Sequence, residues 1–259
     1  MKLFVLPPVS VFTDPTRTAY LGECRSYSHY NYLRPGLIQT LKRSRFEKAL
    51  KLAQADMGKG AALDVGCADG ILLPSLARYF DEVVGIDNDQ PSLNVAQSLV
   101  ESIPLKNVKL ICNAGMSFET LRERLGRKFR VAFVLETLEH VGSLPRLYET
   151  KTDFVRSVFS LMELEGVVIA SVPRMVGMRF LVKYLIQTSL RIPTEKHNFG
   201  NLMRSALLRD TSRLEGHWTG GHYGFNHLRL TEALKKAFEV EVFGSLTSVF
   251  YRIRQRKGT

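Results

Sequence analysis

Residues 61–70 read AALDVGCADG, an apolar run that passes directly into a turn of small residues. Asp64 lies near the end of the apolar run, and Gly66 and Gly70 bracket the turn. Glycine lets the backbone approach a ligand closely, and the run ILLPSLARYF that follows at 71–80 is typical of a helix. This order of strand, tight turn and helix predicts a βα unit with a ligand-binding loop at the carboxyl end of its strand.

The same alternation of strand and helix continues along the chain. After a break of about 55 residues it resumes with Thr231 as the N-cap of a helix, followed by two strands that are close enough to form an antiparallel hairpin. Such a pattern predicts an α/β fold with a doubly wound, mostly parallel seven-stranded sheet, a helical insertion after the fifth strand and a C-terminal antiparallel hairpin. We expect the strands after the first at 82–87, 108–112, 130–135, 166–173, 240–246 and 248–256, and helices at 92–103, 118–128, in a long region before 166 and at 232–239.

Composition excludes two classes of protein. The chain has 259 residues, of which 45% are hydrophobic and 24% charged, an ordinary globular mixture. Three cysteines (Cys24, Cys67 and Cys112) cannot form a disulfide framework, and no apolar run is long enough to span a membrane. The opening apolar run is too short for a secretion leader. We therefore expect neither a secreted miniprotein nor a multispan membrane protein, and predict a cytoplasmic location.

The net charge of +11 is distributed unevenly. Residues 57–173 carry 12 basic and 15 acidic side chains, whereas residues 174–213 carry eight basic and two acidic ones. The remaining basic excess lies in 1–56 and 214–259. The positive charge therefore concerns the partners of the flanking segments, and not the chemistry of the central segment.

Acidic residues at the ends of two strands indicate what the loop binds. Asp87 ends the strand after the one that contains Asp64, a position suited to a hydrogen bond with both hydroxyls of a ribose. The turn lacks the GxGxxG spacing of dinucleotide folds, with Ala68 between its glycines. Asp64 and Asp69 would repel a phosphate but attract an amino group or a sulfonium. The pattern favours a nucleoside with a cationic tail over the cofactor of a nicotinamide oxidoreductase.

Four successive motifs resemble those of class I S-adenosylmethionine-dependent methyltransferases: ALDVGCADG, VVGIDND, VLETLEHV and GVVIASVP. They extend over roughly residues 58–173, and ETLEHV is similar to the segment of small-molecule and quinone O-methyltransferases. The resemblance implies a Rossmann-like fold and the cofactor S-adenosyl-L-methionine. It further implies that Asp69 holds the methionine end together with Asp64 and Gly66, beside Gly70. Carried over in the same way, Asp87 holds the ribose, Asn88, Asn113 and Ala114 line the adenosine side, and Glu136 lines the cofactor.

The resemblance also implies a division of the chain. We expect an N-terminal helical lid segment at 1–56, the cofactor-binding core at 57–173, an acceptor-side insertion at 174–230, and a C-terminal helix and strand hairpin at 231–259 that completes the core. Tyr27 or Tyr30 in the lid segment would contact ligand, although ordinary packing explains them equally well.

Methyl transfer to a hydroxyl group requires a base, and the sequence offers two candidates. His140 follows the fourth strand on the side where the methyl group is expected, with a helix cap or a backbone contact as the alternative role. His222 belongs to the segment GHWTGGHYGFNH at 216–227, which we interpret as an acceptor-facing loop or a hydrogen-bonded structural loop. Its aromatic walls would be Trp218, Tyr223 and Phe225, with His222 or His227 as polar contacts.

No metal site is expected in this segment, because the spacing of its histidines requires a helix that the glycines disfavour. The stretch 175–193 reads as a basic amphipathic helix with a polar stripe through Arg179, Lys183, Gln187 and Arg191. Such a helix lies at a membrane surface as a peripheral contact, or packs on the domain as a lid.

The sequence therefore predicts an S-adenosylmethionine-dependent methyltransferase acting on oxygen of an anionic or amphiphilic small molecule: a lipid, a quinone or a glycan precursor. RNA methylation is one alternative, disfavoured because the basic residues of 174–213 accompany aliphatic rather than aromatic side chains. A non-catalytic S-adenosylmethionine-binding module is another. No obligate protein partner can be read from the sequence.

Overall fold

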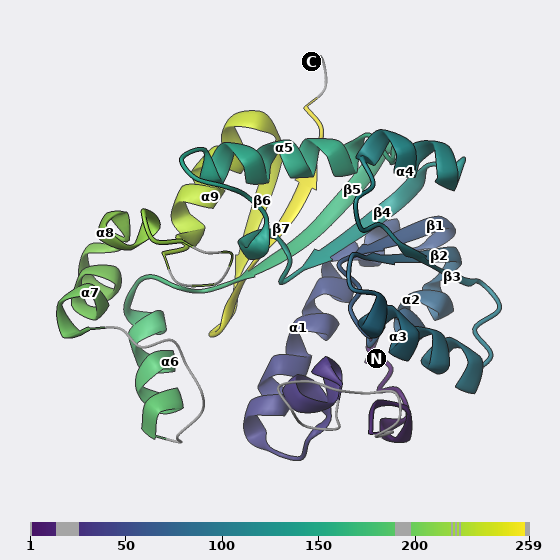
Figure 1. Ribbon diagram of the computed structural model, residues 1–259, viewed down its shortest axis with the longest axis horizontal. Coiled ribbons are helices and arrows are strands. Elements are labelled where there is room, and N and C mark those ends of the chain that lie inside the picture. Colours follow the sequence, from purple (N-terminus) through teal and green to yellow (C-terminus); the bar gives the residue numbers. More distant parts are fainter. Residues whose placement is uncertain are drawn as a thin grey trace. The chain divides into compact units, whose positions relative to one another are not determined.

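The fold was obtained as a computed structural model, which describes residues 2–13, 26–189, 198–218, 220, 222 and 224–256. Among these residues seven strands form one mixed sheet in the order β3-β2-β1-β4-β5-β7-β6 (Figure 1). The predicted α/β, Rossmann-like sheet with its C-terminal antiparallel hairpin is confirmed. The strands are β1 (Gly58–Val65), β2 (Phe80–Asp87), β3 (Val108–Cys112), β4 (Phe129–Leu135), β5 (Met162–Pro173), β6 (Glu239–Gly244) and β7 (Ser248–Arg254).

The chain divides into two compact units: residues 1–134 with 158–169, and residues 135–157 with 170–259. The division into four segments expected from the sequence stays a prediction. The first unit contains the parallel strands β1, β2 and β3, and the second contains the hairpin of β6 and β7.

In the first unit, parallel pairing aligns the strand ends that bear the predicted cofactor residues. β1 pairs with β2 through Asp64 and Gly85, and β2 pairs with β3 through Asp87 and Cys112. Residues 83–86 of β2 are all buried, as expected for a strand covered on both faces. The helices of this unit are α1 (Leu37–Ala53), α2 (Leu73–Tyr79), α3 (Gln90–Ser102) and α4 (Phe118–Leu125), with shorter turns η1 (Val9–Phe12), η2 (His29–Leu33) and η3 (Gln54–Asp56).

Local sequence signals define the helix ends in this unit. Asp89 caps α3 by accepting a hydrogen bond from the Ser92 amide, and Ser117 caps α4 in the same way. Gly126 ends α4 in the left-handed conformation with φ 61°. The predicted helices at 92–103 and 118–128 therefore lie where expected, to within three residues at each end.

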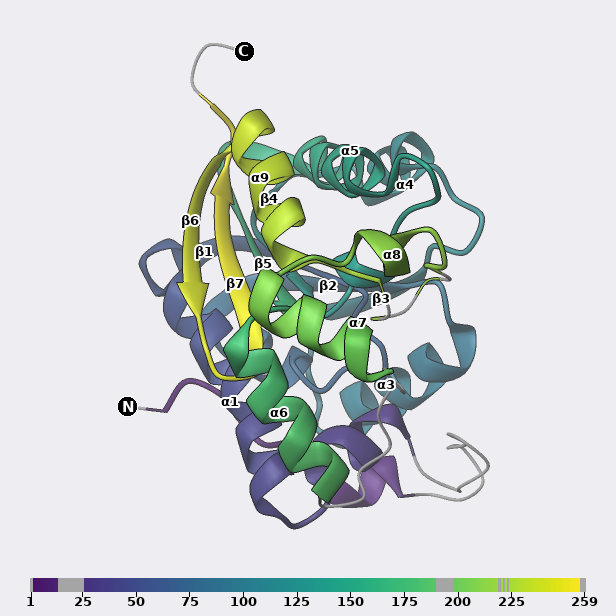
Figure 2. The ribbon, with the colours of Figure 1, turned by 90° about the vertical axis from the view of Figure 1, so that its left-hand side faces the viewer.

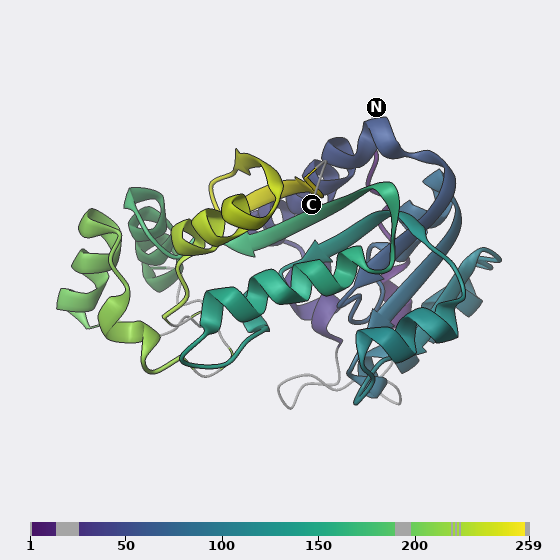
Figure 3. The ribbon, with the colours of Figure 1, turned by 90° about the horizontal axis from the view of Figure 1, so that it is seen from above.

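The second unit combines the antiparallel hairpin with several short helices. Figure 2 shows α9 beside the hairpin, and the Tyr251 hydroxyl of β7 donates to the His227 carbonyl over 3.1 Å. Figure 3 shows the green helices α6, α7 and α8 grouped at one end of α9. The elements are η4 (Leu138–His140), α5 (Leu147–Phe159), α6 (Met178–Ser189), α7 (Phe199–Met203), η5 (Arg204–Leu208), α8 (Ser212–Glu215) and α9 (His227–Ala237).

Two sequence-based boundaries are wrong. α9 begins at His227 and is capped by Asn226, whose side chain accepts from the Leu228 amide, so Thr231 is not the N-cap. The Thr231 hydroxyl instead donates to the His227 carbonyl one turn earlier, which lets a threonine sit inside a helix. The helical region before the fifth strand ends at Phe159, and β5 already begins at Met162.

Candidate active site

Backbone hydrogen bonds hold the turn after β1 in shape. The amides of Gly66 and Cys67 both donate to the Ile86 carbonyl of β2, over 2.8 and 3.1 Å. Gly70 has φ 82°, and a Cβ added there would lie 2.8 Å from Leu73 Cδ1. Glycine at this position therefore lets the turn pack closely against α2, which is a structural need separate from any contact with ligand.

Asp87 ends β2 and ties the turn to the neighbouring strand end. Its Oδ2 accepts from the Ala68 amide over 2.8 Å, and its Oδ1 accepts from the Asp89 amide over 2.9 Å. Each carboxylate oxygen has a further lone pair. The half-buried carboxylate is thus fixed in orientation and can accept two hydroxyl groups of a ribose.

Asp64 is a buried carboxyl at the end of β1. It is 4% exposed, and burial, followed by the charge of Asp87, raises its pKa to about 7. A cation placed beside it would favour its ionised form. This environment fits the positively charged methionine end of S-adenosylmethionine.

Asp69 is buried beneath the N-terminal segment. It is 1% exposed and accepts from the Ser28 amide over 2.7 Å and from the Ser28 hydroxyl. Burial raises the pKa of Asp69, and the hydrogen bonds from Ser28 oppose that rise. The structure therefore shows Asp69 anchoring Ser28, while its contact with the methionine end stays a prediction. The sequence contains no signal for the role of Ser28.

Asn113 follows β3 and supplies an acceptor that suits adenine. Its amide donates to the Asp87 carbonyl over 2.9 Å, and its side-chain oxygen is buried without a hydrogen-bond partner among the described residues. An adenine amino group would satisfy that oxygen. Asn88 and Ala114 are exposed at the same strand ends. The residues of this unit therefore fit the predicted cofactor.

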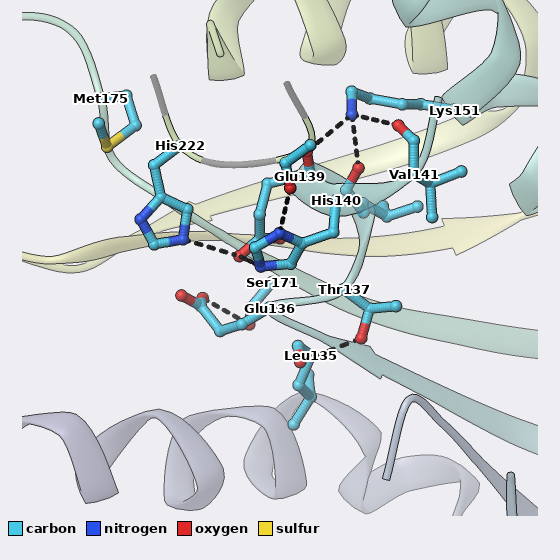
Figure 4. A network of polar contacts seen from close by, with 12 residues as sticks. Leu135, Glu136, Thr137, Glu139, His140, Val141, Lys151, Ser171, Met175 and His222 are labelled. Carbon is cyan, nitrogen blue, oxygen red and sulfur yellow. Dashed lines mark hydrogen bonds and ion pairs between the residues drawn. The ribbon is translucent and has the colours of Figure 1, made fainter. Parts of the chain in front are cut away.

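Glu136 opens the candidate site of the second unit. It adopts a left-handed backbone conformation with φ 54°, which is uncommon for a residue other than glycine. Its amide donates to the Ser171 carbonyl over 2.9 Å, and its Oε1 accepts from the Ser171 hydroxyl over 3.0 Å (Figure 4). These bonds hold the segment after β4 against β5.

His140, Glu139 and His222 form a cluster in this unit (Figure 4). His140 Nδ1 lies 2.6 Å from the Gly220 carbonyl oxygen, which can only accept, so Nδ1 carries the proton. The Nε2 atoms of His140 and His222 lie 3.9 and 3.6 Å from Glu139 Oε1. Both rings therefore present Nε2 toward the carboxylate of Glu139, which is fully buried.

A buried lysine holds the segment that carries this cluster. Lys151 of α5 is 0% exposed, and its ammonium donates to the carbonyls of Leu138 (2.8 Å), Glu139 (3.0 Å) and Val141 (Figure 4). Burial lowers the pKa of Lys151 to about 8, and the charge of Glu139 opposes that shift. Nothing in the sequence distinguishes this lysine from those on the surface.

The aromatic residues expected to face an acceptor are partly used for packing. Lys151 Nζ lies 4.7 Å from the ring centre of Trp218 and 5.4 Å from that of Phe225, and both rings are buried. His227 is buried at the start of α9, where burial and nearby cations lower its pKa to about 4. Tyr223 lies outside the described residues. Of the predicted polar contacts, only His222 joins the cluster.

The cluster also has the composition of a cation site. One ligand atom from each of Glu139, His140 and His222 lies within 4.8 Å of the others, and two imidazoles with a carboxylate are a common set for a divalent cation. The spacing of His217, His222 and His227 in the sequence disfavoured a metal site formed by these three histidines. Of these three, the structure brings only His222 into the cluster, together with Glu139 and His140.

Comparisons with known proteins identify the family of this chain. Residues 62–161 match the family described as "Methyltransferase domain". The chain is 30% identical over 189 residues to a ubiquinone biosynthesis O-methyltransferase of Pseudomonas fluorescens (strain Pf0-1), covering 70% of this chain and 74% of that protein.

Solved structures share the fold at low sequence identity. The N-methyltransferase NodS from Bradyrhizobium japonicum WM9, in complex with S-adenosyl-l-homocysteine, is 14% identical with a TM-score of 0.52, covering 89% of this chain and 97% of that one. The magnesium protoporphyrin IX methyltransferase from Synechocystis PCC 6803, also with the demethylated cofactor bound, is 14% identical with a TM-score of 0.51 over 86% and 89% of the two chains. The chain belongs to the class I methyltransferases that use S-adenosylmethionine as their methyl donor.

Proposed function

We propose that this enzyme methylates a hydroxyl oxygen of an amphiphilic, quinone-type small molecule. One observation carries the proposal: His140 donates its Nδ1 proton to the Gly220 carbonyl, which leaves the Nε2 lone pair to accept a proton from an acceptor hydroxyl. The buried Glu139 carboxylate 3.9 Å from Nε2 would stabilise the imidazolium that forms. Its relatives named ubiquinone biosynthesis O-methyltransferase support the same acceptor class.

S-adenosylmethionine supplies a methyl group that is already activated on a sulfonium. The tasks left to the chain are to orient the cofactor, exclude water and remove the acceptor proton. We assign the ribose to Asp87, the adenine to Asn113 and the cationic end to Asp64. His222, with Nε2 3.6 Å from the same Glu139 oxygen, would position the acceptor or share its proton.

An exposed apolar surface in the second unit supports an amphiphilic acceptor. α6 buries Phe180 but exposes Met178, Val182, Leu185 and Ile186, while Arg179 accompanies them on the same helix. We propose that this face contacts a membrane surface from which the acceptor is taken. Among the described residues no helix is long and apolar enough to cross a membrane, and a cytoplasmic location stays a prediction.

A second candidate chemistry rests on the donor set of the cluster. If Glu139, His140 and His222 held a divalent cation, the cation would lower the pKa of an acceptor hydroxyl, and the proton would pass to solvent instead of to His140. A chelator separates the two: it would abolish activity, restorable by added Mg²⁺, Mn²⁺ or Zn²⁺, only if the cluster acts through a cation.

Cofactor binding can be tested by calorimetry with S-adenosylmethionine. We expect Asp87→Asn to weaken binding at least about tenfold, because one charged acceptor for the ribose hydroxyls is lost. Glu123→Gln removes an exposed carboxylate of α4 and is the matched control, for which we expect unchanged affinity. Equal affinity of Asp87→Asn and the wild type would contradict the assignment.

The acceptor can be found with cofactor labelled in its methyl group. The enzyme is incubated with lipid-soluble, water-soluble and RNA fractions of a cell extract, and the labelled product is identified by mass spectrometry. We expect label in a phenolic or quinol compound of the lipid-soluble fraction. Label in RNA would favour RNA methylation, and tight cofactor binding without transfer to any fraction would favour a non-catalytic module.

A further inference from the structure

A cavity in the second unit has arginines and no carboxylate among its lining residues, all of which the structure describes. It has a volume of about 400 Å³. Charge is contributed by Arg174, which follows β5, by Arg179 of α6 and by Arg209, which follows η5. Five apolar side chains complete the lining with Gly177 and His227: Val176, Met178, Ala206, Leu207 and Leu228.

Two of these arginines meet beside a glycine of β6. A Cβ added to Gly244 of β6 would lie 2.9 Å from a terminal nitrogen of Arg174 and 3.7 Å from one of Arg179, so both guanidinium groups meet where β6 has no side chain. The Gly177 amide donates to the Ser205 carbonyl over 2.9 Å, which joins the start of α6 to η5. The backbone of Arg209 has φ 55°, in the left-handed region that residues other than glycine rarely adopt.

Two buried nitrogen atoms accompany the positive charge of the pocket. Arg174 Nε and His227 Nδ1 are buried without hydrogen-bond partners among the described residues. His227 is 2% exposed, and its pKa is lowered to about 4, first by burial and then by Arg174, Arg209 and Lys183. Asp210 directly follows Arg209 in the sequence. It pairs with Arg204 and accepts from the Ser212 amide, so it does not neutralise the arginines of the pocket.

We propose that this arginine pocket binds a phosphate-type oxyanion. Guanidinium groups bind phosphate oxygens through paired, charge-assisted hydrogen bonds, and one oxyanion would relieve the mutual repulsion of the three arginines. It would also offer an acceptor to Arg174 Nε and to a protonated His227. The apolar lining leaves room for an organic group attached to the phosphate, as in a phosphoester or a lipid headgroup.

Phosphate binding can be measured by calorimetry on the full chain without S-adenosylmethionine, with inorganic phosphate as the probe and chloride at matched ionic strength as the reference. We expect millimolar or tighter binding, weakened at least about tenfold by Arg174→Gln or Arg179→Gln. Arg213→Gln, an exposed residue of α8 outside the pocket, makes the same charge change and should bind like the wild type. No binding, or equal weakening by all three substitutions, would overturn the proposal.

NMR titration of His227 gives a second readout that is independent of affinity. Bound phosphate should raise the pKa of His227 from about 4, because its charge offsets that of the arginines. An unchanged His227 pKa at saturating phosphate would place the ion elsewhere and overturn the proposal.

The source of the oxyanion is distinguished by a second probe, dihexanoylphosphatidic acid below its micelle concentration. Affinity at least about tenfold above that of inorganic phosphate, lost in Arg179→Gln, would identify a lipid headgroup as the ligand, whereas equal affinity would identify free phosphate. The proposal does not depend on the methyl-transfer reaction. Cofactor binding measured on the same samples separates its failure from that of the proposed function.

Discussion

The candidate cofactor residues of the first unit and the histidine–glutamate cluster of the second unit are held in different ways. In the first unit, the residues from Asp64 to Asn113 lie within one continuous stretch, and backbone hydrogen bonds between adjacent strand ends hold them. In the second unit, His140 contacts Gly220 from 80 positions away, and a buried ammonium and a buried carboxylate support the cluster. The cofactor residues are thus held within one stretch of chain, whereas the cluster depends on a contact between distant segments and on buried charged groups.

This difference predicts different consequences of substitution. A change in the backbone-held turn should alter cofactor affinity and leave the second unit intact. A change among the buried charges should affect both stability and chemistry, because an unpaired buried charge is costly. Substitutions in each unit test this contrast.

His140→Ala should lower kcat about 10²–10⁴-fold, the contribution typical of a positioned general base, and should leave cofactor affinity unchanged. His217→Ala removes an exposed histidine in the turn after α8 and serves as control. Product formation and calorimetry on the same samples provide the measurement. If His140→Ala lost cofactor affinity instead of turnover, the assignment of His140 to proton transfer would be wrong.

Lys151→Met should reduce the free energy of unfolding by about 3 kcal/mol, because three carbonyls lose the buried ammonium that donates to them. Lys236→Met, an exposed residue of α9, should change it by less than about 0.5 kcal/mol. Urea denaturation followed by circular dichroism compares the two. Equal stability of both variants would show that the lysine contacts contribute nothing.

Asp64 makes the stability of the protein and its affinity for the cofactor depend on pH. Its pKa rises from 3.8 in the unfolded chain to about 7 in the native protein, so the native state binds more protons between these values. The contribution of Asp64 to stability therefore falls as the pH rises from about 4 to about 7. A bound cation favours the ionised carboxylate, so cofactor affinity should increase as the pH passes through 7.

Asp64→Asn should remove that increase in affinity and flatten the fall in stability. The pKa of Asp69 is raised as well, so the test is the difference between variant and wild type from pH 5 to pH 8. A wild-type affinity that stays constant across this range would contradict the placement of the cationic end at Asp64.

Ser28→Ala should have the smallest effect, a loss of about 1–2 kcal/mol in unfolding free energy, because the Ser28 amide still donates to Asp69. Ser44→Ala on the exposed face of α1 provides the comparison. Thermal unfolding of both variants at one pH measures the difference. A larger loss for Ser44→Ala would mean that Ser28 does not anchor the N-terminal segment.

The fold was predictable where local signals agree. The apolar runs of β1 and β2, the turn AALDVGCADG and the N-caps Asp89 and Ser117 all point to the same alternation. The prediction of Thr231 as N-cap was wrong because threonine is only one of several common N-caps. Asn226, which precedes it in the sequence, caps the helix instead.

The cluster of Glu139, His140 and His222 was predictable only in part. His140 could be identified from its place after a buried strand, but Glu139 could not, since a buried carboxylate looks like an exposed one in sequence. The contact of His140 with Gly220 requires knowledge of which distant segments meet, and the role of Lys151 requires knowledge that its side chain is buried. Local patterns contain no such information.

Gly85 of β2 has a practical consequence for labelling the enzyme. It has no side chain, and a Cβ there would lie 3.1 Å from the Cys67 sulfur, which fills this space behind the turn. Burial raises the pKa of the Cys67 thiol, whereas Cys112 is half-exposed beside Asp87. Of these two cysteines, a maleimide dye should therefore react with Cys112, and its fluorescence would report the arrival of the cofactor at the strand end.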